Sequence, residues 1–533
     1  MSAEDHRPAI LWVDDEIDLL KSQIRFLESR GYDVATVTNG PDAVALVKER
    51  PFAAVLLDEI MVGMDGIATL RELKAADPSL PVIMVTKSTE ESMMDDAYFG
   101  ETEDYLVKPV SPHQILSALK KVVELARLRR ERFVAGWGPY YNRAQQVIGD
   151  GGPTFADWAN LYLEMCRAGG EAKALELEAI ASLQAELLAE ADATFARFVC
   201  GAYPAWVAGG DDAPPLAWNI LDRFVLPWIA AGRPVYFIVV DCLRLDQWLA
   251  LEERLASRFR IERALYCGAL PSVTLYARNA IFAGEPPEVI ARRFRSVFKE
   301  ETGSGESLNR YEEEFLTDHL ARSAPRVKKV KYYKFANWEQ ERKAPRVIEG
   351  VSPRPLNAFV FNFVDAVTHE AGRGGALDAF APGPDGLPRL ALTWFVGSPL
   401  EHLLARVAEE PDAVVVLTTD HGSTFTDAPA VVFADKGAAK TPRYWVGRDL
   451  RAEDDGAFLI RHPAEFGLPA DYLAKTYAVA LGRHHLVFSH HLREYHKRFE
   501  GGFFHGGVSL AELILPVVTM VSRKSSRDGP VRR

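Results

Sequence analysis

Six polar side chains between residues 241 and 505 have the types and spacing of a metal centre. They are three carboxylates and three imidazoles: Asp241, Asp365, Asp420, His369, His421 and His505. A set of oxygen and nitrogen donors suits borderline divalent metals, with zinc first. Asp365 and His369 are one helical turn apart, so both can face one ion. We therefore predict a zinc site in this part of the chain.

The hydroxyls of Ser272 and Thr274 are candidate nucleophiles. They lie in Leu270–Asn279, where a proline ends an extended segment and the following residues look helical. A helix N-terminus with free backbone N–H groups favours a phosphate oxygen. Neither hydroxyl has an obvious partner base, but a metal ion can lower the pKa of a hydroxyl and take that role. Two Zn²⁺ ions would balance the charge of the three carboxylates and one ionised threonine.

A second group of carboxylates lies near the N-terminus. Asp14 and Asp15 follow one apolar run, and Asp58 follows another. Parallel sheets place ligands at the carboxyl ends of their strands, and carboxylates gathered there need a cation, for which Mg²⁺ is well suited. Lys108 and the hydroxyl of Thr86 are positioned to respond to an added phosphoryl group.

Short apolar runs alternate with helix-like segments in two parts of the sequence. In the first part, the predicted strands are Ala9–Val13, Tyr32–Val37, Ala53–Leu57, Val82–Val85 and Tyr105–Val107. In the second part, they are Val235–Val240, Ala358–Val364, Ala413–Thr418 and a strand near Leu513–Val521. This alternation predicts parallel sheets covered by helices. Between the two parts, the Ala/Leu/Glu-rich stretch around Ala172–Ala189 predicts a small helical bundle.

Composition limits the class of protein. The chain has 533 residues, 48% hydrophobic and 26% charged, which suits several globular domains and excludes a disordered or coiled-coil chain. The net charge of −12 has the wrong sign for a general nucleic-acid coat, although a local basic groove is still allowed. The 4 cysteines are scattered, and no run approaches the ~20 apolar residues of a membrane span. A reduced, cytoplasmic protein without membrane insertion is expected.

The N-terminal motifs resemble the receiver domain of response regulators. They are Val13–Asp15, Asp58–Met61 with Met64–Gly66, Thr86, and Asp104–Pro109. One departure is Val62, where the family usually has proline. The resemblance implies that Asp58 accepts a phosphoryl group from a sensor histidine kinase. It also implies further roles: Asp15, Asp58 and the Ile60 carbonyl hold Mg²⁺, Asp14 helps through water, and Thr86 and Tyr105, with Lys108, form the switch.

The C-terminal motifs resemble the alkaline phosphatase superfamily, and within it the PglZ-type domains. They are Pro271–Thr274 with Arg278 and Asn279, Asp365 with His369, Asp420–Gly422, and His505–Gly507, in family order. The resemblance implies two Zn²⁺ ions: one held by Asp241, Thr274, Asp420 and His421, the other by Asp365, His369 and His505. Thr274 matches the nucleophile of the nucleotide pyrophosphatase branch, which implies a two-metal phosphodiesterase.

A receiver joined by helices to a PglZ-type domain is the arrangement of PorX-like response regulators. We therefore expect an α/β multidomain fold. Its parts are a flavodoxin-like receiver at 1–125, a helical-bundle linker at 126–232, an alkaline-phosphatase-like parallel α/β sandwich at 233–522, and a tail at 523–533. The resemblance implies zinc-dependent phosphodiesterase action on short linear or cyclic oligonucleotides, controlled by phosphorylation at Asp58 and linked to type IX secretion.

Several residues outside the metal motifs are candidate substrate contacts. The segment with Lys328 and Lys331 interleaves cations with aromatic residues, either as a surface that stacks bases or as an amphipathic strand with its lysines in water. Arg443 lies in a basic, glycine-bearing segment, Lys436–Trp445, that could form a lid, with Arg443 as a phosphate clamp. Arg278 and Asn279 could contact phosphate or pack their own helix.

Two functional classes stay open. In the first, the receiver gates a phosphodiesterase, and phosphorylation changes self-association to give a homodimer. In the second, the metals only brace a domain that docks a transcription factor or a secretion component without catalysis. The enzyme is favoured because bracing does not require a hydroxyl nucleophile such as Thr274.

Overall fold

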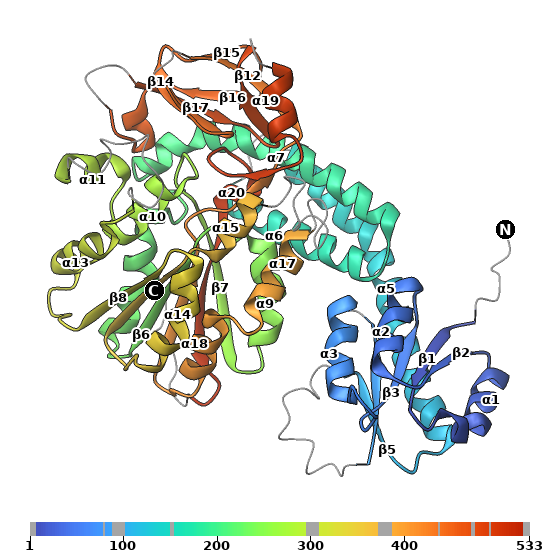
Figure 1. Cartoon of the computed structure of the whole chain (residues 1–533). Helices are drawn as coiled ribbons and strands as arrows, with labels where there is room; N and C mark the ends of the chain where they lie inside the picture. The colour runs from blue at the N-terminus through green and yellow to red at the C-terminus, as the bar shows by residue number, and fades with distance from the viewer. Residues whose placement is uncertain are drawn as a thin grey trace. The chain divides into compact units, whose positions relative to one another are not determined.

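The computed structural model describes residues 7–77, 80–87, 102–149, 154–294, 309–370, 386–434, 438–470, 475–489 and 492–525. The chain divides into two compact units: Met1–Arg143 with Glu171–Ala181, and Ala144–Gly170 with Ser182–Arg533. Each unit contains its own large sheet, and each is described here by itself (Figure 1). Among the described helices, none is both long and apolar enough to cross a membrane.

The smaller unit contains a parallel sheet in the order β2-β1-β3-β4-β5. Its strands are β1 (Ala9–Val13), β2 (Asp33–Val37), β3 (Ala54–Asp58), β4 (Val82–Thr86) and β5 (Asp104–Val107). The helices around it are α1 (Lys21–Ser29), α2 (Gly40–Glu49), α3 (Gly66–Ala76) and the start of α5 (Pro112–Gly149). The inner strands β3 and β4 are buried along their whole length because helices cover both faces. The strand order is that of the flavodoxin-like fold, so this prediction is confirmed.

Local signals in the sequence fix where the helices of this unit begin. The side chain of Asn39 accepts a hydrogen bond from Asp42 N at 2.9 Å, and that of Asp65 accepts one from Ala68 N at 2.7 Å. These are N-caps of α2 and α3. At Gly66, a Cβ would lie 2.3 Å from the carbonyl oxygen of Asp58. The chain can therefore turn closely past the end of β3 only with glycine at this position.

The larger unit contains a six-stranded sheet in the order β7-β20-β10-β6-β9-β8. Its strands are β6 (Val235–Val240), β7 (Phe259–Cys267), β8 (Val330–Phe335), β9 (Leu356–Phe361), β10 (Val414–Thr418) and β20 (Ile514–Ser522). Strands β10, β6, β9 and β8 are parallel, as predicted. Strand β20 runs antiparallel to β10 and to β7, so the expectation of a wholly parallel sheet is corrected. Strand β9 also ends earlier than predicted, because helix α15 (Phe363–Glu370) begins there.

Helices cover both faces of this sheet because its strands are apolar on both sides. On one face, Tyr236 and Ile238 of β6 belong to the same core cluster as residues of α9 (Leu245–Leu255), α14 (Trp338–Glu349) and α18 (Pro399–Ala408). On the other face, Phe237 meets Phe282 of α10 (Thr274–Ala283), with ring centroids 5.8 Å apart. Alternate side chains of β6 thus pack in opposite directions.

The helical region contains α5, α6 (Phe155–Ala174) and α7 (Glu178–Val207), and the boundary expected at residue 125 falls inside α5. Two side chains of α7 are tied to loops of the larger unit. Asp192 accepts a hydrogen bond from Leu510 N at 2.7 Å. The Tyr203 hydroxyl accepts one from Leu270 N at 3.2 Å and donates to Gly268 O at 3.3 Å. Helix α7 therefore supports the loops that carry the candidate site.

A β-rich region between Thr424 and Val487 was not predicted. It contains the sheets β15-β12-β18 and β13-β14-β17-β16. The strands are β12 (Ala428–Phe433), β13 (Ala439–Lys440), β14 (Tyr444–Arg448), β15 (Arg451–Ala452), β16 (Ala457–Ile460), β17 (Lys475–Ala480) and β18 (His484–Val487). They are short, and several are only half-buried, so they lack the long apolar runs that indicate buried strands.

Candidate active site and receiver site

The carboxyl ends of three neighbouring parallel strands bring three carboxylates together. Asp241 directly follows β6, Asp420 follows β10 by one residue, and Asp365 lies in the first turn of α15 after β9. Because β10, β6 and β9 are adjacent in the sheet, their carboxyl ends lie side by side. Open parallel sheets generally bind ligands at this edge.

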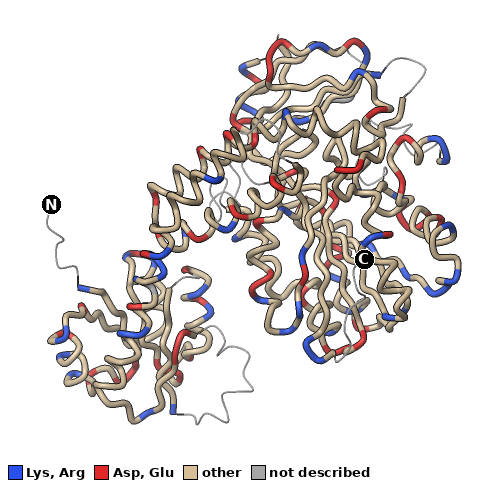
Figure 2. Tube along the Cα trace, turned by 180° about the vertical axis from the view of Figure 1, so that it is seen from behind, with Lys and Arg blue, Asp and Glu red and all other residues tan. Residues whose placement is uncertain are grey.

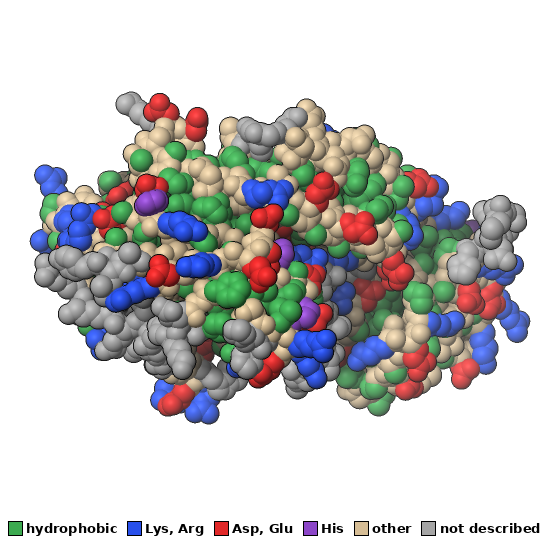
Figure 3. Space-filling model, turned by 90° about the horizontal axis from the view of Figure 1, so that it is seen from above, with side chains coloured by type: hydrophobic (Ala, Val, Ile, Leu, Met, Phe, Trp, Pro, Cys, Tyr) green, Lys and Arg blue, Asp and Glu red, His purple; other side chains and the backbone are tan. Residues whose placement is uncertain are grey.

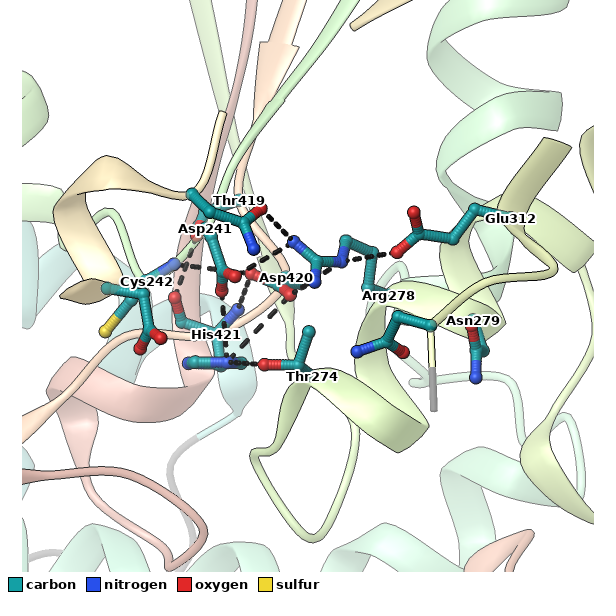
Figure 4. Close-up of polar contacts among 12 residues, drawn as sticks. Asp241, Cys242, Thr274, Arg278, Asn279, Glu312, Thr419, Asp420 and His421 are labelled. Carbon is teal, nitrogen blue, oxygen red and sulfur yellow. Dashed lines mark hydrogen bonds and ion pairs between the residues drawn. The ribbon is translucent and has the colours of Figure 1, made fainter. Parts of the chain in front are cut away.

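Asp241, Asp420 and His421 form the first metal group, in which one ligand atom of each lies within 4.8 Å of the others (Figure 4). All three side chains are buried. His421 Nε2 lies 3.5 Å from Asp241 Oδ1 and 3.0 Å from Thr274 Oγ1. The structure therefore places the Thr274 hydroxyl at the edge of the first metal group.

Asp365, His369 and His505 form the second metal group, also with ligand atoms within 4.8 Å of one another. His505 Nε2 lies 3.3 Å from His369 Nε2 and 3.7 Å from Asp365 Oδ1. The His505 ring stacks on the His421 ring of the first metal group, with centroids 4.1 Å apart. The two metal groups therefore adjoin.

Buried carboxylate oxygens without hydrogen bonds show that both groups suit cations. Within the described part of the chain, no hydrogen-bond partner reaches Asp241 Oδ1, Asp365 Oδ1 or Asp420 Oδ2. Leaving such oxygens unpaired costs free energy, and the carboxylates also repel one another. Carboxylate oxygens and imidazole nitrogens are ligands that divalent transition metals accept. The residues present therefore fit one divalent ion in each metal group.

Burial also displaces the protonation equilibria of these residues. Burial, and then the charge of Asp241, raise the pKa of Asp420 to about 6 and that of Asp365 to about 6. Burial and two neighbouring imidazoles hold the pKa of His505 well below its usual range. A neutral imidazole is the form that binds a metal, and a divalent cation relieves the repulsion between carboxylates.

Arg278 supplies a buried positive charge beside the first metal group. Its guanidinium lies 2.9 Å from Asp241 Oδ2, 2.7 Å from Glu312 Oε1 and 2.9 Å from Asn362 Oδ1 (Figure 4). The side chain is only 1% exposed, so Arg278 orients Asp241 from within the protein rather than contacting a substrate. Because Oδ2 of Asp241 is occupied by Arg278, Oδ1 is left facing His421.

Asn279 also lies in the interior. Its amide donates a hydrogen bond to Leu275 O of the same helix at 2.8 Å, and Figure 4 shows it apart from the metal ligands. Of the two roles considered for Arg278 and Asn279, the structure supports packing inside the protein. It gives no support to phosphate contact by either residue.

Lys328 precedes the edge strand β8, and Lys331 is the second residue of that strand. Lys331 of β8 pairs in register with Asn357 near the start of β9, whereas the metal ligands follow the strand ends. Both lysines are exposed. The aromatic residues of the segment pack on the sheet, since Tyr333 stacks on Phe359 with ring centroids 4.7 Å apart. The segment therefore has the form of an amphipathic edge strand, one of the two alternatives, and substrate contact by the two lysines stays a prediction.

Arg443 is not a surface clamp. Its side chain is fully buried, forms an ion pair with Glu512 and donates a hydrogen bond to His484 O. The first two residues of the expected lid, 436 and 437, lie outside the described residues. The rest of that segment contributes to β13 and β14. A guanidinium neutralised in the interior cannot reach a phosphate, so this expectation is also corrected.

Acidic and basic residues are interspersed along the chain (Figure 2). On the face shown in Figure 3, the described Lys and Arg side chains lie among acidic and apolar ones and do not gather into one basic patch. This distribution agrees with the net charge of −12. It gives no support to a long nucleic-acid track, which needs a row of cations.

The receiver site lies at the carboxyl ends of β1 and β3 in the smaller unit. One carboxylate oxygen each of Asp14, Asp15 and Asp58 lies within 4.8 Å of the others. Lys108 Nζ lies 2.8 Å from Asp58 Oδ1 and 3.1 Å from Asp14 Oδ2. Burial raises the pKa of Asp58, and Lys108 opposes that rise. Three carboxylates against one ammonium leave an excess of negative charge that fits a hard divalent cation such as Mg²⁺.

The expected switch residues Thr86 and Tyr105 lie in the neighbouring strands β4 and β5. The Thr86 side chain is buried, and its hydroxyl donates a hydrogen bond to Glu59. Tyr105 is 40% exposed, and Ile60 and Val62 are 57% and 83% exposed. Val62, which stands where the family usually has proline, donates its backbone N–H to Asp15 Oδ2 at 3.3 Å. A proline could not form that hydrogen bond.

Sequence reasoning missed Glu312, Asn362 and Glu512 as residues around the metal groups. Glu312 begins helix α13 (Glu312–Ser323) in a run of three glutamates, which is typical of an exposed helix start. Asn362 directly follows β9, and a polar residue at a strand end was the one available signal. Glu512 lies between apolar residues and gave no signal.

Two family profiles match the chain. The profile described as BREX system PglZ alkaline phosphatase-like domain matches residues 220–520, more than half of the chain. The profile of the response regulator receiver domain matches residues 10–120.

Characterised relatives share the N-terminal part. The transcriptional regulatory protein ZraR of Salmonella typhimurium is 36% identical over 118 residues, 22% of this chain and 27% of that protein. ResD of Bacillus subtilis is 33% identical over 117 residues, 22% of this chain and 48% of that protein. The chain thus spans less than half the length of either relative. A CheY-like receiver structure from Methanospirillum hungatei JF-1 is 26% identical, covering 22% of this chain and 95% of that one, with a TM-score of 0.21.

The two family profiles agree with the geometry of both sites. Alkaline phosphatase-like domains depend on metal ions, and receiver domains bind Mg²⁺ and take a phosphoryl group from a phosphodonor such as a histidine kinase. The chain therefore belongs to the PglZ family of alkaline phosphatase-like proteins and carries a response regulator receiver domain in its N-terminal part.

Proposed function

We propose that this protein is a PorX-like response regulator in which phosphorylation of Asp58 controls a zinc-dependent phosphodiesterase. One observation carries the proposal: six side chains with metal-binding atoms and the hydroxyl of Thr274 meet at one edge of the large sheet. Asp241, Asp420 and His421 would hold one ion with Thr274, and Asp365, His369 and His505 would hold the other. A pure docking domain would not need a hydroxyl at that edge.

Thr274 is placed to act as the nucleophile. It is the first residue of α10, and the N-terminus of a helix favours the oxygens of a phosphate bound beside it. The hydroxyl oxygen would attack phosphorus and displace one alcohol, which leaves with the proton that the hydroxyl gives up. Water would then attack the same phosphorus, which releases the phosphomonoester product and restores the Thr274 hydroxyl. Bound Zn²⁺ would lower the pKa of this hydroxyl and stabilise the leaving oxygen.

The charges around the site favour a phosphodiester over a phosphomonoester. Arg278, the buried cation beside the first metal group, is already engaged by Asp241 and Glu312. A singly charged diester needs less positive charge than a doubly charged monoester. Short linear or cyclic oligonucleotides are the proposed substrates, as the resemblance to PorX-like response regulators implies.

Metal content tests the proposal most directly. Purified protein loaded with Zn²⁺ is expected to retain two equivalents and to hydrolyse bis(p-nitrophenyl) phosphate. Asp420→Asn should retain about one equivalent, because it changes a ligand of the first metal group only. Elemental analysis beside turnover checks both points. Wild-type protein with two equivalents of zinc and no hydrolysis of any diester would contradict the proposal.

Regulation is proposed to act through self-association. A phosphoryl group on Asp58 adds about −1.5 to −2 charges beside Lys108 and Thr86, which should reorder the receiver face bearing Tyr105 and favour a homodimer. Signalling to a transcription factor or to a type IX secretion component belongs to the same proposal.

Sedimentation with beryllofluoride, a phosphoryl mimic, and Mg²⁺ is expected to show about twice the monomer mass. Asp58→Asn removes the acceptor carboxylate and should stay at the mass of the untreated protein. An unchanged wild-type mass would count against dimerisation.

A further inference from the structure

Glu512 contacts the segment that precedes Thr274 and the segment that follows His505. It belongs to the short helix α20 (Leu510–Leu513) and is fully buried. Its Oε1 accepts hydrogen bonds from Gly507 N at 2.8 Å and from Ser272 Oγ at 3.1 Å. Its Oε2 accepts one from Ser509 Oγ at 2.7 Å. One carboxylate therefore holds a residue of each segment.

The charge of Glu512 is compensated in the interior. Arg443, also fully buried, forms an ion pair with Oε2 and lies 3.3 Å from Oε1 through its Nε. A buried carboxylate is stable only when it is paired and its oxygens are hydrogen-bonded, and both conditions hold here. This pairing explains why Arg443 lies inside the protein rather than on a lid.

Ser272 connects this carboxylate to a metal ligand. The Ser272 hydroxyl accepts a hydrogen bond from Gly506 N at 2.9 Å, and its own proton faces both Glu512 Oε1 and Gly507 O. The Ser272 carbonyl oxygen lies 3.1 Å from His505 Nδ1. With a proton on Nδ1 donated to this carbonyl, Nε2 is left free to face His369 and the second metal group.

The glycines of the loop permit this close packing. Gly506 has a φ of +114°, which residues with a side chain rarely adopt. A Cβ on Gly507 would lie 2.4 Å from Ala480 O. The backbone that follows His505 can therefore press against Glu512 and Ser272 only because it lacks side chains.

The hydrogen bonds of the Glu512 side chain lead to an imidazole of the second metal group but, among the described residues, not to Asp241, Asp420 or the His421 ring of the first. They lead through Ser272 and Gly506 to His505. Among the described residues, the hydrogen bonds of Asp241 and Asp420 come from Arg278, Cys242 and the backbone of His421, and none comes from the Glu512 side chain. A change at Glu512 should therefore lower zinc affinity at the second metal group more than at the first.

We propose that Glu512 is a positioning residue that holds His505, through Ser272 and the Gly506–Gly507 backbone, in the orientation in which its Nε2 completes the second metal group. The inference rests on the proposed function in one respect, that the second metal group binds Zn²⁺. It does not depend on the identity of the substrate or on turnover.

Zinc affinity measured site by site tests this inference on the full chain. Zn²⁺ is titrated in competition with a fluorescent chelator, and Asp365→Asn identifies the signal of the second metal group. Glu512→Gln places an amide donor where an acceptor is needed, so zinc affinity at the second metal group is expected to fall by about 10- to 100-fold. Affinity at the first metal group should stay within about twofold of wild type.

Two further variants serve as checks. Ser272→Ala keeps the Arg443–Glu512 ion pair but removes the hydroxyl that connects Glu512 to Gly506. The same loss of zinc affinity at the second metal group is expected, and this variant tests the role even if Glu512→Gln does not fold. Glu252→Gln makes the same chemical change on α9, where Glu252 pairs with Arg263 and accepts from Trp248 Nε1 at 2.6 Å. This control should change neither affinity.

An equal loss at both metal groups in Ser272→Ala, or unchanged affinities in a folded Glu512→Gln protein, would overturn the positioning role. A wild-type chain that binds no Zn²⁺ would instead overturn the proposed zinc function, and the inference with it. The two failures are distinguishable because the second concerns the unmutated protein.

Discussion

Thr274→Val is expected to lower the turnover of a chromogenic phosphodiester by at least about 10³-fold. Valine keeps the β-branched shape of threonine at the start of α10 but has no hydroxyl. In the structure, that hydroxyl is 3.0 Å from His421 Nε2, beside a group of ligands with unpaired buried oxygens. Without it, no alcohol oxygen at this position can attack phosphorus.

The matched control is Thr274→Ser, which restores the hydroxyl without the methyl group. It should keep measurable turnover, whereas the valine variant should not. Zinc content should remain at two equivalents in both variants, since the other ligands of each metal group are intact. Turnover of the valine variant within about tenfold of wild type would show that Thr274 is not the nucleophile.

The same variant separates catalysis from docking. If signalling in cells persists while hydrolysis is lost, the metal groups serve mainly to brace a binding domain. If both are lost while the variant stays folded and loaded with zinc, the product of hydrolysis carries the signal. The downstream readout is therefore measured beside turnover in the same variant.

Arg278→Met is expected to lower the free energy of unfolding by about 3–5 kcal/mol, because it leaves buried carboxylates without their cation. The guanidinium is 1% exposed and lies within 2.9 Å of both Asp241 Oδ2 and Asn362 Oδ1, and 2.7 Å from Glu312 Oε1. Methionine fills much of the volume but carries no charge. Urea unfolding in the presence of a chelator measures the loss without compensation by metal ions.

Two comparisons make this prediction specific. Arg322→Met removes an arginine that pairs with Asp318 and Glu285 on the surface, where an ion pair contributes about 0–1 kcal/mol. The double variant Arg278→Met, Glu312→Gln should lose less free energy of unfolding than the sum of the two single changes. The second change removes a buried carboxylate that the first change leaves without its cation. A cost for Arg278→Met as small as that for Arg322→Met would refute the buried role.

Most of the fold class was predictable because its signals are local. The strands Ala9–Val13 and Val235–Val240 have the predicted bounds, since a run of apolar residues between turn-forming segments specifies a buried strand. Asn39 and Asp65 cap helices at positions that short-range hydrogen bonds determine. The candidate metal ligands were also predictable, because parallel strands place the residues that follow them at the same edge of the sheet.

The pairing of distant segments was not predictable in the same way. Strand β20 pairs with β7 in antiparallel register from Ile514 with Cys267 to Ser522 with Phe259. An apolar run specifies burial but neither its neighbour nor its direction. The short strands between Thr424 and Val487 were missed because pairing with one another, rather than their own composition, makes them strands.

The sequence by itself determined which residues could bind metal and accept a phosphoryl group, because residue type and position after a strand are properties of short segments. Only the tertiary structure decided which charged residues are available to a ligand. Arg278 is neutralised by Glu312, 34 residues away in the chain, and Arg443 by Glu512, 69 residues away. Lys331 lies near the start of β8, whereas the metal ligands follow the ends of neighbouring strands. Burial and counter-charge arise from contacts between distant segments, and no local pattern encodes them.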